Sequence, residues 1–74
     1  MGGHISVMTA LGIVEGEVLR CLEEHGPTTL RRLVAELDWP AAMVIMGVGA
    51  LIRERLAQGI QRGGDWTVRK MEVR

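Results

Sequence analysis

The chain has 74 residues, of which 47% are hydrophobic, with two Trp and no Phe or Tyr. This is enough for one small domain with an aliphatic core, and it leaves little room for a deep catalytic cleft. Nine Lys and Arg balance nine Asp and Glu, so no overall charge attracts a polyanion.

The charges are unevenly distributed along the chain. Residues 1–50 contain three Lys and Arg against six Asp and Glu, whereas residues 51–74 contain six against three. The C-terminal third is therefore the basic end. No apolar stretch reaches the roughly 18 residues of a membrane span without interruption, and Cys21 is the only cysteine. We therefore expect a cytoplasmic protein without a disulfide, in which Cys21 is a small buried side chain.

The first helix is expected from about Ala10 to Glu24, after a flexible leader over residues 1–9. Thr9 is the expected N-cap, and Gly16 is interpreted as a point where another backbone approaches closely. The sequence His-Gly-Pro at 25–27 is typical of a helix end. One apolar stripe follows three- and four-residue spacing: Leu11, Val14, Val18, Cys21 and Leu22.

Two further helices are expected close together, as a helix-turn-helix requires. Thr28 is expected in a short extended stretch, and Thr29 is expected to cap the helix that continues to Leu37. Pro40 suits the first position of the third helix, expected from Pro40 to Arg55. Helical spacing predicts a core face of Val44, Ile45, Val48, Leu51 and Ile52. It predicts an opposite face of Ala42, Met43, Met46, Gly49, Ala50 and Arg53.

After Leu56 the pattern changes to a β-hairpin. Residues 59–62 and 66–69 read as two strands, with Gly63-Gly64-Asp65 as the tight turn between them. Trp66 and Val68 lie on the same side of a strand. A hairpin alone is only marginally stable, so both side chains are expected to pack onto the helices.

This order predicts a mainly α domain with a small β-hairpin, a winged helix-turn-helix over residues 10–71, followed by a tail at 72–74. The segments GPTTLRRL at 26–33 and GALIRERL at 49–56 carry a resemblance to winged-helix proteins, and the second resembles the helix-end and wing-entry segment of many prokaryotic winged-helix regulators. With GEVL at 16–19, the chain resembles a small stand-alone prokaryotic winged-helix family of unknown function. The resemblance implies a regulator-type binding domain and leaves its target open.

Residues for catalysis or cofactor binding do not form any familiar pattern. His4, Cys21 and His25 lack the pairing of a zinc site, although the last two are neighbours on a helix surface. The glycines match no phosphate-binding loop, and Ser6 has no nearby His–acid partner. We expect no enzyme, no cofactor and no metal.

The first functional hypothesis is DNA binding. In winged-helix proteins the third helix enters the major groove and the wing contacts phosphates. Here the outer face of that helix offers apolar side chains, which favours backbone contacts over reading of bases. Arg62 in the wing is the leading candidate for a phosphate contact. The candidates, if they converge, are Arg31, Arg32, Arg53, Arg62, Arg69 and Lys70.

The alternative hypothesis is a protein-interaction module, which includes a homodimer. A stripe rich in Met and small residues is typical of a partner surface when it is exposed. Burial of that stripe by the leader or by Trp39 is the competing interpretation. The candidate interface residues are Ala42, Met43, Met46, Gly49 and Ala50.

Overall fold

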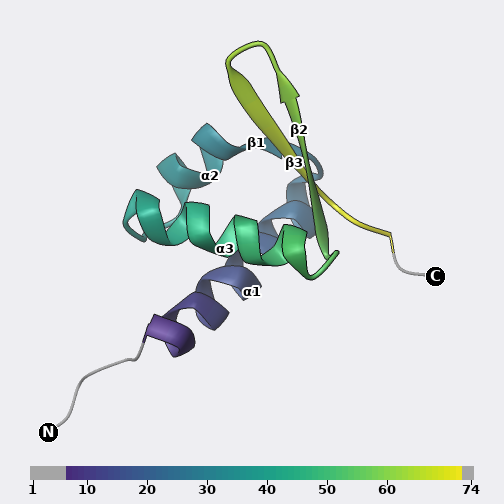
Figure 1. Cartoon of the computed structure of the whole chain (residues 1–74). Coiled ribbons are helices and arrows are strands. Elements are labelled where there is room, and N and C mark those ends of the chain that lie inside the picture. The colour runs from purple at the N-terminus through teal and green to yellow at the C-terminus, as the bar shows by residue number, and fades with distance from the viewer. Residues whose placement is uncertain (1–6, 73–74) are drawn as a thin grey trace, which may run out of the picture.

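The computed structural model of the chain describes residues 7–72 and contains three helices and a three-stranded antiparallel sheet (Figure 1). The elements are α1 (Val7–His25), β1 (Thr28–Thr29), α2 (Leu30–Glu36), α3 (Ala41–Arg53), β2 (Ala57–Arg62) and β3 (Asp65–Lys70). The strand order is β1-β3-β2. The predicted fold class is confirmed: three helices form the core, and β2 and β3 form the wing. None of the helices described has both the length and the apolar character needed to cross a membrane.

Helix α1 is longer than predicted at its N-terminal end. It begins at Val7, so Thr9 lies within the helix and is not its N-cap. The predicted leader therefore overlaps the first turn, and residues 1–6 lie outside the described residues. The C-terminal end agrees with the prediction: Gly26 has a φ of 75°, and its amide donates to the Leu22 carbonyl at 2.8 Å. A glycine in this left-handed conformation is the usual end of a helix.

Two capping residues, Thr29 and Pro40, define where α2 and α3 begin. The Thr29 hydroxyl accepts a hydrogen bond from the Arg32 amide at 3.1 Å, which confirms the predicted cap of α2. Pro40 is the N-cap of α3, whereas the sequence predicted it as the first residue of the helix. Its carbonyl accepts hydrogen bonds from the amides of Met43 and Val44.

Helix α3 is rotated about its axis relative to the prediction. Ile45 and Ile52, both expected in the core, are 50% and 39% exposed. The buried residues of the helix are Val44, Gly47, Val48 and Leu51. The helix contacts α1 through Gly47, because a Cβ there would stand 2.8 Å from the Val14 Cγ1 atom. A Cβ at Gly16 would meet nothing within 4 Å, so the expected close approach at Gly16 is wrong and occurs at Gly47 instead.

The end of α3 leads into the wing through a left-handed residue. Arg55 has a φ of 64°. Its amide donates to the Ile52 carbonyl at 3.0 Å, and the Leu56 amide donates to the Leu51 carbonyl at 2.9 Å. These two bonds define a Schellman motif, in which glycine is the preferred residue at the left-handed position.

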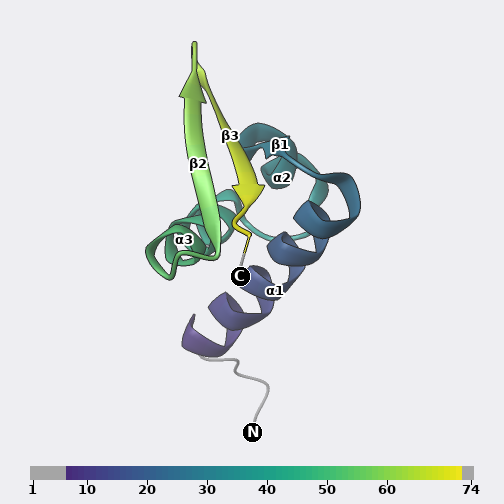
Figure 2. The ribbon, with the colours of Figure 1, turned by 90° about the vertical axis from the view of Figure 1, so that its right-hand side faces the viewer.

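The hairpin is two residues longer at its start than predicted, and its turn is Gly63-Gly64 between the paired residues Arg62 and Asp65. Val68 is fully buried, as expected, but Trp66 is 46% exposed. Trp66 pairs with Gln61 near the turn, and the tip of the wing rises beyond the helices (Figure 2). The helices therefore cannot enclose the Trp66 ring.

Candidate functional site

The exposed apolar side chains of α3 and the wing form one surface, which we call the α3–wing face. It consists of Ile45, Gly49 and Ile52 on α3, with Gly59 and Trp66 on the wing. Residues three and four apart lie next to one another on a helix surface, so Gly49 lies between the two isoleucines. All three of these α3 residues are exposed.

Gly59 connects the helical part of this face to the wing. A Cβ at Gly59 would lie 3.3 Å from the Ile52 Cδ1 atom and 3.3 Å from the Trp66 Cε3 atom. The Trp66 ring and the Ile52 side chain therefore both lie over a strand residue that has no side chain of its own. An aromatic ring across a strand glycine covers the exposed backbone, so Ile52, Gly59 and Trp66 form a continuous apolar surface.

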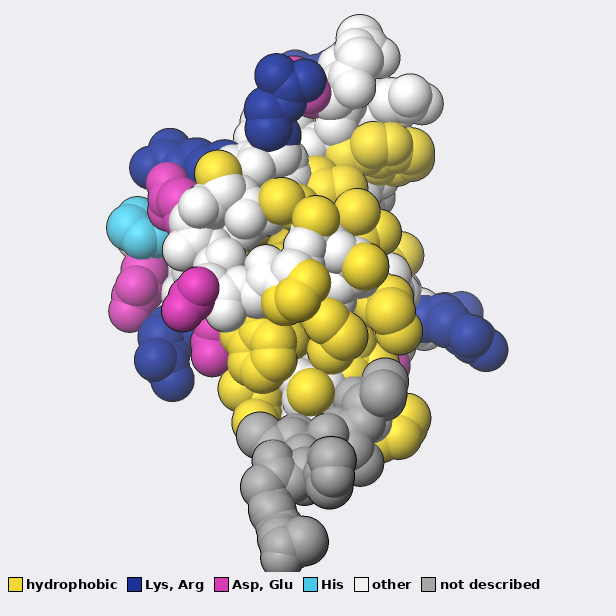
Figure 3. All heavy atoms as spheres, turned by 90° about the vertical axis from the view of Figure 1, so that its left-hand side faces the viewer, with side chains coloured by type: hydrophobic (Ala, Val, Ile, Leu, Met, Phe, Trp, Pro, Cys, Tyr) yellow, Lys and Arg dark blue, Asp and Glu magenta, His cyan; other side chains and the backbone are white. Residues whose placement is uncertain are grey.

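This side of the molecule carries hydrophobic side chains from the wing down past α3 (Figure 3). Basic and acidic side chains lie mainly around its margin in that view. A contiguous apolar patch rimmed by polar residues is typical of a surface that contacts another macromolecule.

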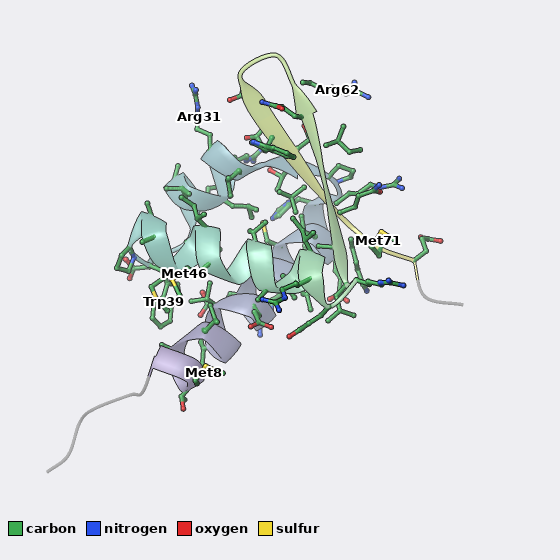
Figure 4. The ribbon with its side chains drawn as sticks, in the orientation of Figure 1. Met8, Arg31, Trp39, Met46, Arg62 and Met71 are labelled. Atoms are coloured by element: carbon green, nitrogen blue, oxygen red, sulfur yellow. The ribbon has the colours of Figure 1, made fainter. Side chains whose placement is uncertain are left out.

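The predicted partner interface agrees only in part with this face. Met46 is 47% exposed, and Ala42 and Gly49 are also exposed, whereas Met43 and Ala50 are half-buried. Met43 packs against the core. In the view of Figure 4, the Met46 and Trp39 side chains are both drawn on the lower side of α3.

On α3, Ile45 and Ile52 are the exposed members of the face that the sequence pattern placed in the core, as it did Trp66 on the wing. The available signal was composition: α3 has 13 residues and Arg53 is its only charged one. A helix that is apolar on all sides presents more apolar surface than three short helices can cover. Periodicity alone could not show which part of it stays exposed.

Trp39 covers part of α1 and does not bury the whole stripe. Its indole Nε1 donates to Glu17 Oε1 at 3.1 Å, and the ring is half-buried against the core. Within the described residues, burial of the stripe applies in part to Met43 and Ala50 and not to Met46. A contribution from the predicted leader before Val7 lies outside the described residues.

The structure gives half of the six candidate phosphate-binding residues a carboxylate partner. Arg31 lies 3.4 Å from Asp65, Lys70 lies 2.6 Å from Glu23, and Arg32 pairs with Glu36 one turn away. Arg69 donates to the Gln58 side chain at 2.9 Å.

Arg53 and Arg62 form no ion pair within residues 7–72. In the view of Figure 4, Arg31 and Arg62 extend on opposite sides of the hairpin tip. Arg31 and Arg62 therefore do not form a single basic cluster. Three of the six candidate charges, those of Arg31, Arg32 and Lys70, are already partly neutralised by carboxylates.

The surroundings of Cys21 do not activate its thiol. Cys21 is half-buried, and burial, reinforced by the nearby Glu36 carboxylate, raises the pKa of its thiol. A raised pKa keeps the thiol protonated and weakly nucleophilic. Within the part of the chain that the structure describes, no three His, Cys, Asp or Glu side chains are grouped to hold a metal ion; His4 lies outside that part.

An acidic contact between α1 and α3 was not anticipated from the sequence. Burial, followed by the charge of Glu54 and a hydrogen bond with that side chain, raises the pKa of Glu15. A neighbouring carboxylate disfavours the ionised form of Glu15. The pair lies on a shallow surface pocket that also includes Met8 and Arg53.

Three helices and a three-stranded antiparallel sheet, with β2 and β3 as the wing, define the fold class: the chain has the winged-helix arrangement. Comparison of the sequence with protein-family models, with curated proteins and with solved structures gave no match.

Proposed function

We propose that this winged-helix domain is a non-enzymatic protein-binding module that uses the α3–wing face. The observation that carries the proposal is the exposure of Ile45, Ile52 and Trp66 on one surface. Burying exposed apolar area is the main driving force of protein association, and a large aromatic side chain such as Trp is a common anchor in interfaces.

The chemistry of α3 supports this proposal over reading of DNA sequence. Specific contacts to base edges need side chains that donate or accept hydrogen bonds. On its exposed side α3 offers Ile, Met, Ala and Gly, with Arg53 as the exception. The wing offers Arg62 for a phosphate. DNA binding through the backbone is therefore the second candidate. Its supporting observation is that Arg53 and Arg62, two exposed candidates, form neither an ion pair nor a side-chain hydrogen bond within residues 7–72.

We further propose that the domain belongs with small stand-alone prokaryotic winged-helix proteins and acts in the cytoplasm. Two observations support this: the segments at 26–33 and 49–56, which carry the resemblance, and a single cysteine, Cys21, which is free. A lone cysteine without a disulfide suits a reducing compartment.

Photo-crosslinking tests the protein-binding proposal. A photoreactive amino acid replaces Ile45 in one variant and Ala35, exposed on α2, in the matched control, and both are expressed in the native cells. We expect a crosslinked protein adduct from position 45 and none from position 35. Absence of an adduct at position 45 would contradict the proposal.

A titration with labelled duplex DNA tests the second candidate. Binding through phosphates weakens steeply as salt rises, in proportion to the number of phosphates neutralised. We expect no binding by this domain even at low salt. Binding at low salt that is lost in Arg62→Ala, together with no adduct at position 45, would replace protein binding by DNA binding.

A further inference from the structure

Strand β2 has an unpaired edge among the described residues. The sheet order β1-β3-β2 leaves β2 paired on one side only. The Met71 amide donates to the Leu56 carbonyl at 2.9 Å, which identifies Leu56 as a residue bonded to the β3 side. Because alternate residues of an antiparallel strand point their amides and carbonyls to opposite sides, those of Ala57, Gly59 and Gln61 point to the open edge.

The open edge and the α3–wing face lie on the same side of the molecule. Figure 2 shows β2 and α3 together on one side of β3, with α2 and the C-terminal part of α1 on the other; the first turns of α1 lie below α3. A strand added next to β2 would therefore also cover the apolar side chains of Ile52 and Trp66. The absence of a side chain at Gly59 lets another backbone approach closely.

We propose that β2 pairs antiparallel with β2 of a second copy of the chain, close to Gly59. This inference rests on the proposed function and names the partner. A two-fold axis makes the pairing of two identical strands antiparallel and uses the same surface on both copies. The result is one six-stranded sheet in the order β1-β3-β2-β2-β3-β1. The two α3–wing faces then adjoin and cover each other's isoleucines and Trp66.

The charges along this edge are complementary to themselves under that symmetry. Antiparallel pairing places the wing tip of each copy, with Arg62, next to the start of β2 in the other. There Glu54, an exposed residue, is the C-cap of α3; its carboxylate contacts Glu15 of α1 and, like Arg62, forms no ion pair within residues 7–72. The negative end of the helix dipole adds to the attraction for Arg62. A chain with equal numbers of acidic and basic residues also does not repel its own copy.

Sedimentation of the purified chain across a concentration series tests the pairing. We expect a dimer of twice the 8.1 kDa chain mass. Gln61→Pro removes an outward amide, and the two-fold axis doubles this loss, so the dissociation constant should rise about tenfold or more. Gln61→Ala keeps the amide and should dimerise like the wild type. A thermal melt confirms that the proline variant is folded, because proline is tolerated where the amide of an edge strand faces outward.

Two further measurements keep the test independent of the proline variant. Arg62→Glu should weaken the dimer, and Arg62→Glu combined with Glu54→Arg should restore it. Amide hydrogen exchange at Gly59 and Gln61 should slow as the chain concentration rises.

The result that overturns the pairing is a monomer at every concentration. If position 45 still crosslinks another protein in cells, the face binds a different partner and only the self-pairing is wrong. If position 45 gives no adduct either, the proposed function fails as well.

Discussion

Gly47 of α3 lies directly against Val14 of α1: a Cβ on the glycine would stand 2.8 Å from the Val14 Cγ1 atom and 3.6 Å from its Cβ atom. Carbon atoms prefer separations of about 3.5–4.0 Å, so this contact leaves no room for a side chain. The absence of a side chain at one position therefore sets the distance between two helices.

Gly47→Ala is predicted to destabilise the fold by about 1–3 kcal/mol, the usual cost of adding a methyl group to a packed core. Gly49→Ala is the matched control, because a Cβ at Gly49 would meet nothing within 4 Å. Alanine favours a helix over glycine by about 1 kcal/mol, so the control should be more stable than the wild type. Urea unfolding of both variants measures this. Equal effects of the two substitutions would contradict the contact.

Ile45→Asp and Val44→Asp test the rotation of α3. Val44 is fully buried and Ile45 is half exposed. Burying a carboxylate without a partner is strongly unfavourable, so Val44→Asp should unfold the domain. Ile45→Asp should cost no more than about 1 kcal/mol, mainly from helix propensity. Circular dichroism melts of the two variants separate these outcomes. If Ile45→Asp unfolds the chain under dilute conditions, the helix faces the core as the sequence first suggested.

Arg55→Gly is predicted to stabilise the domain. The φ of 64° at Arg55 places an L-residue in the left-handed region, which costs about 1–2 kcal/mol. Glycine removes that cost and loses part of the gain through the greater freedom of the unfolded chain. The net gain should be about 0.5–1 kcal/mol, or a rise of several degrees in Tm for a domain of this size. Arg53→Gly, inside α3, is the control and should lower the Tm.

The pH dependence of stability should contain a contribution from Glu15. Its pKa in the folded state is raised by burial and by Glu54, so the folded chain binds this proton more readily than the unfolded chain. The stabilising contribution is complete below the unfolded pKa and is lost as pH rises through the folded pKa.

Glu15→Gln removes this dependence. The variant should be more stable than the wild type at pH 7, by less than about 1 kcal/mol because the site is partly solvated. The difference should shrink as the solution is acidified past the ordinary pKa of a glutamate. Urea unfolding from pH 7 to pH 4 measures it, with Glu72→Gln as the control. A difference between Glu15→Gln and the wild type that does not change with pH would show that Glu15 is not perturbed.

The local features of the chain could be predicted from its sequence because they depend on neighbouring residues. The hydroxyl of Thr29, the permissive backbone of Gly26 and the turn at Gly63-Gly64 act over only a few residues, and each was predicted. Asp65 was also assigned to that turn, but it begins β3. The order of helices and strands follows from such local signals together with periodicity, and it is sufficient to indicate the winged-helix fold.

The position of the α3–wing face depended on tertiary structure. Thirteen residues of α3 contain a single charge, so the pattern could not show which side turns inward. The contact of Gly47 with Val14 decides that rotation, and the rotation leaves Ile45 and Ile52 outside. The exposure of Trp66 and the open edge of β2 likewise follow from how far the wing extends beyond the helices. This distance depends on packing between segments far apart in the chain, which no local pattern encodes.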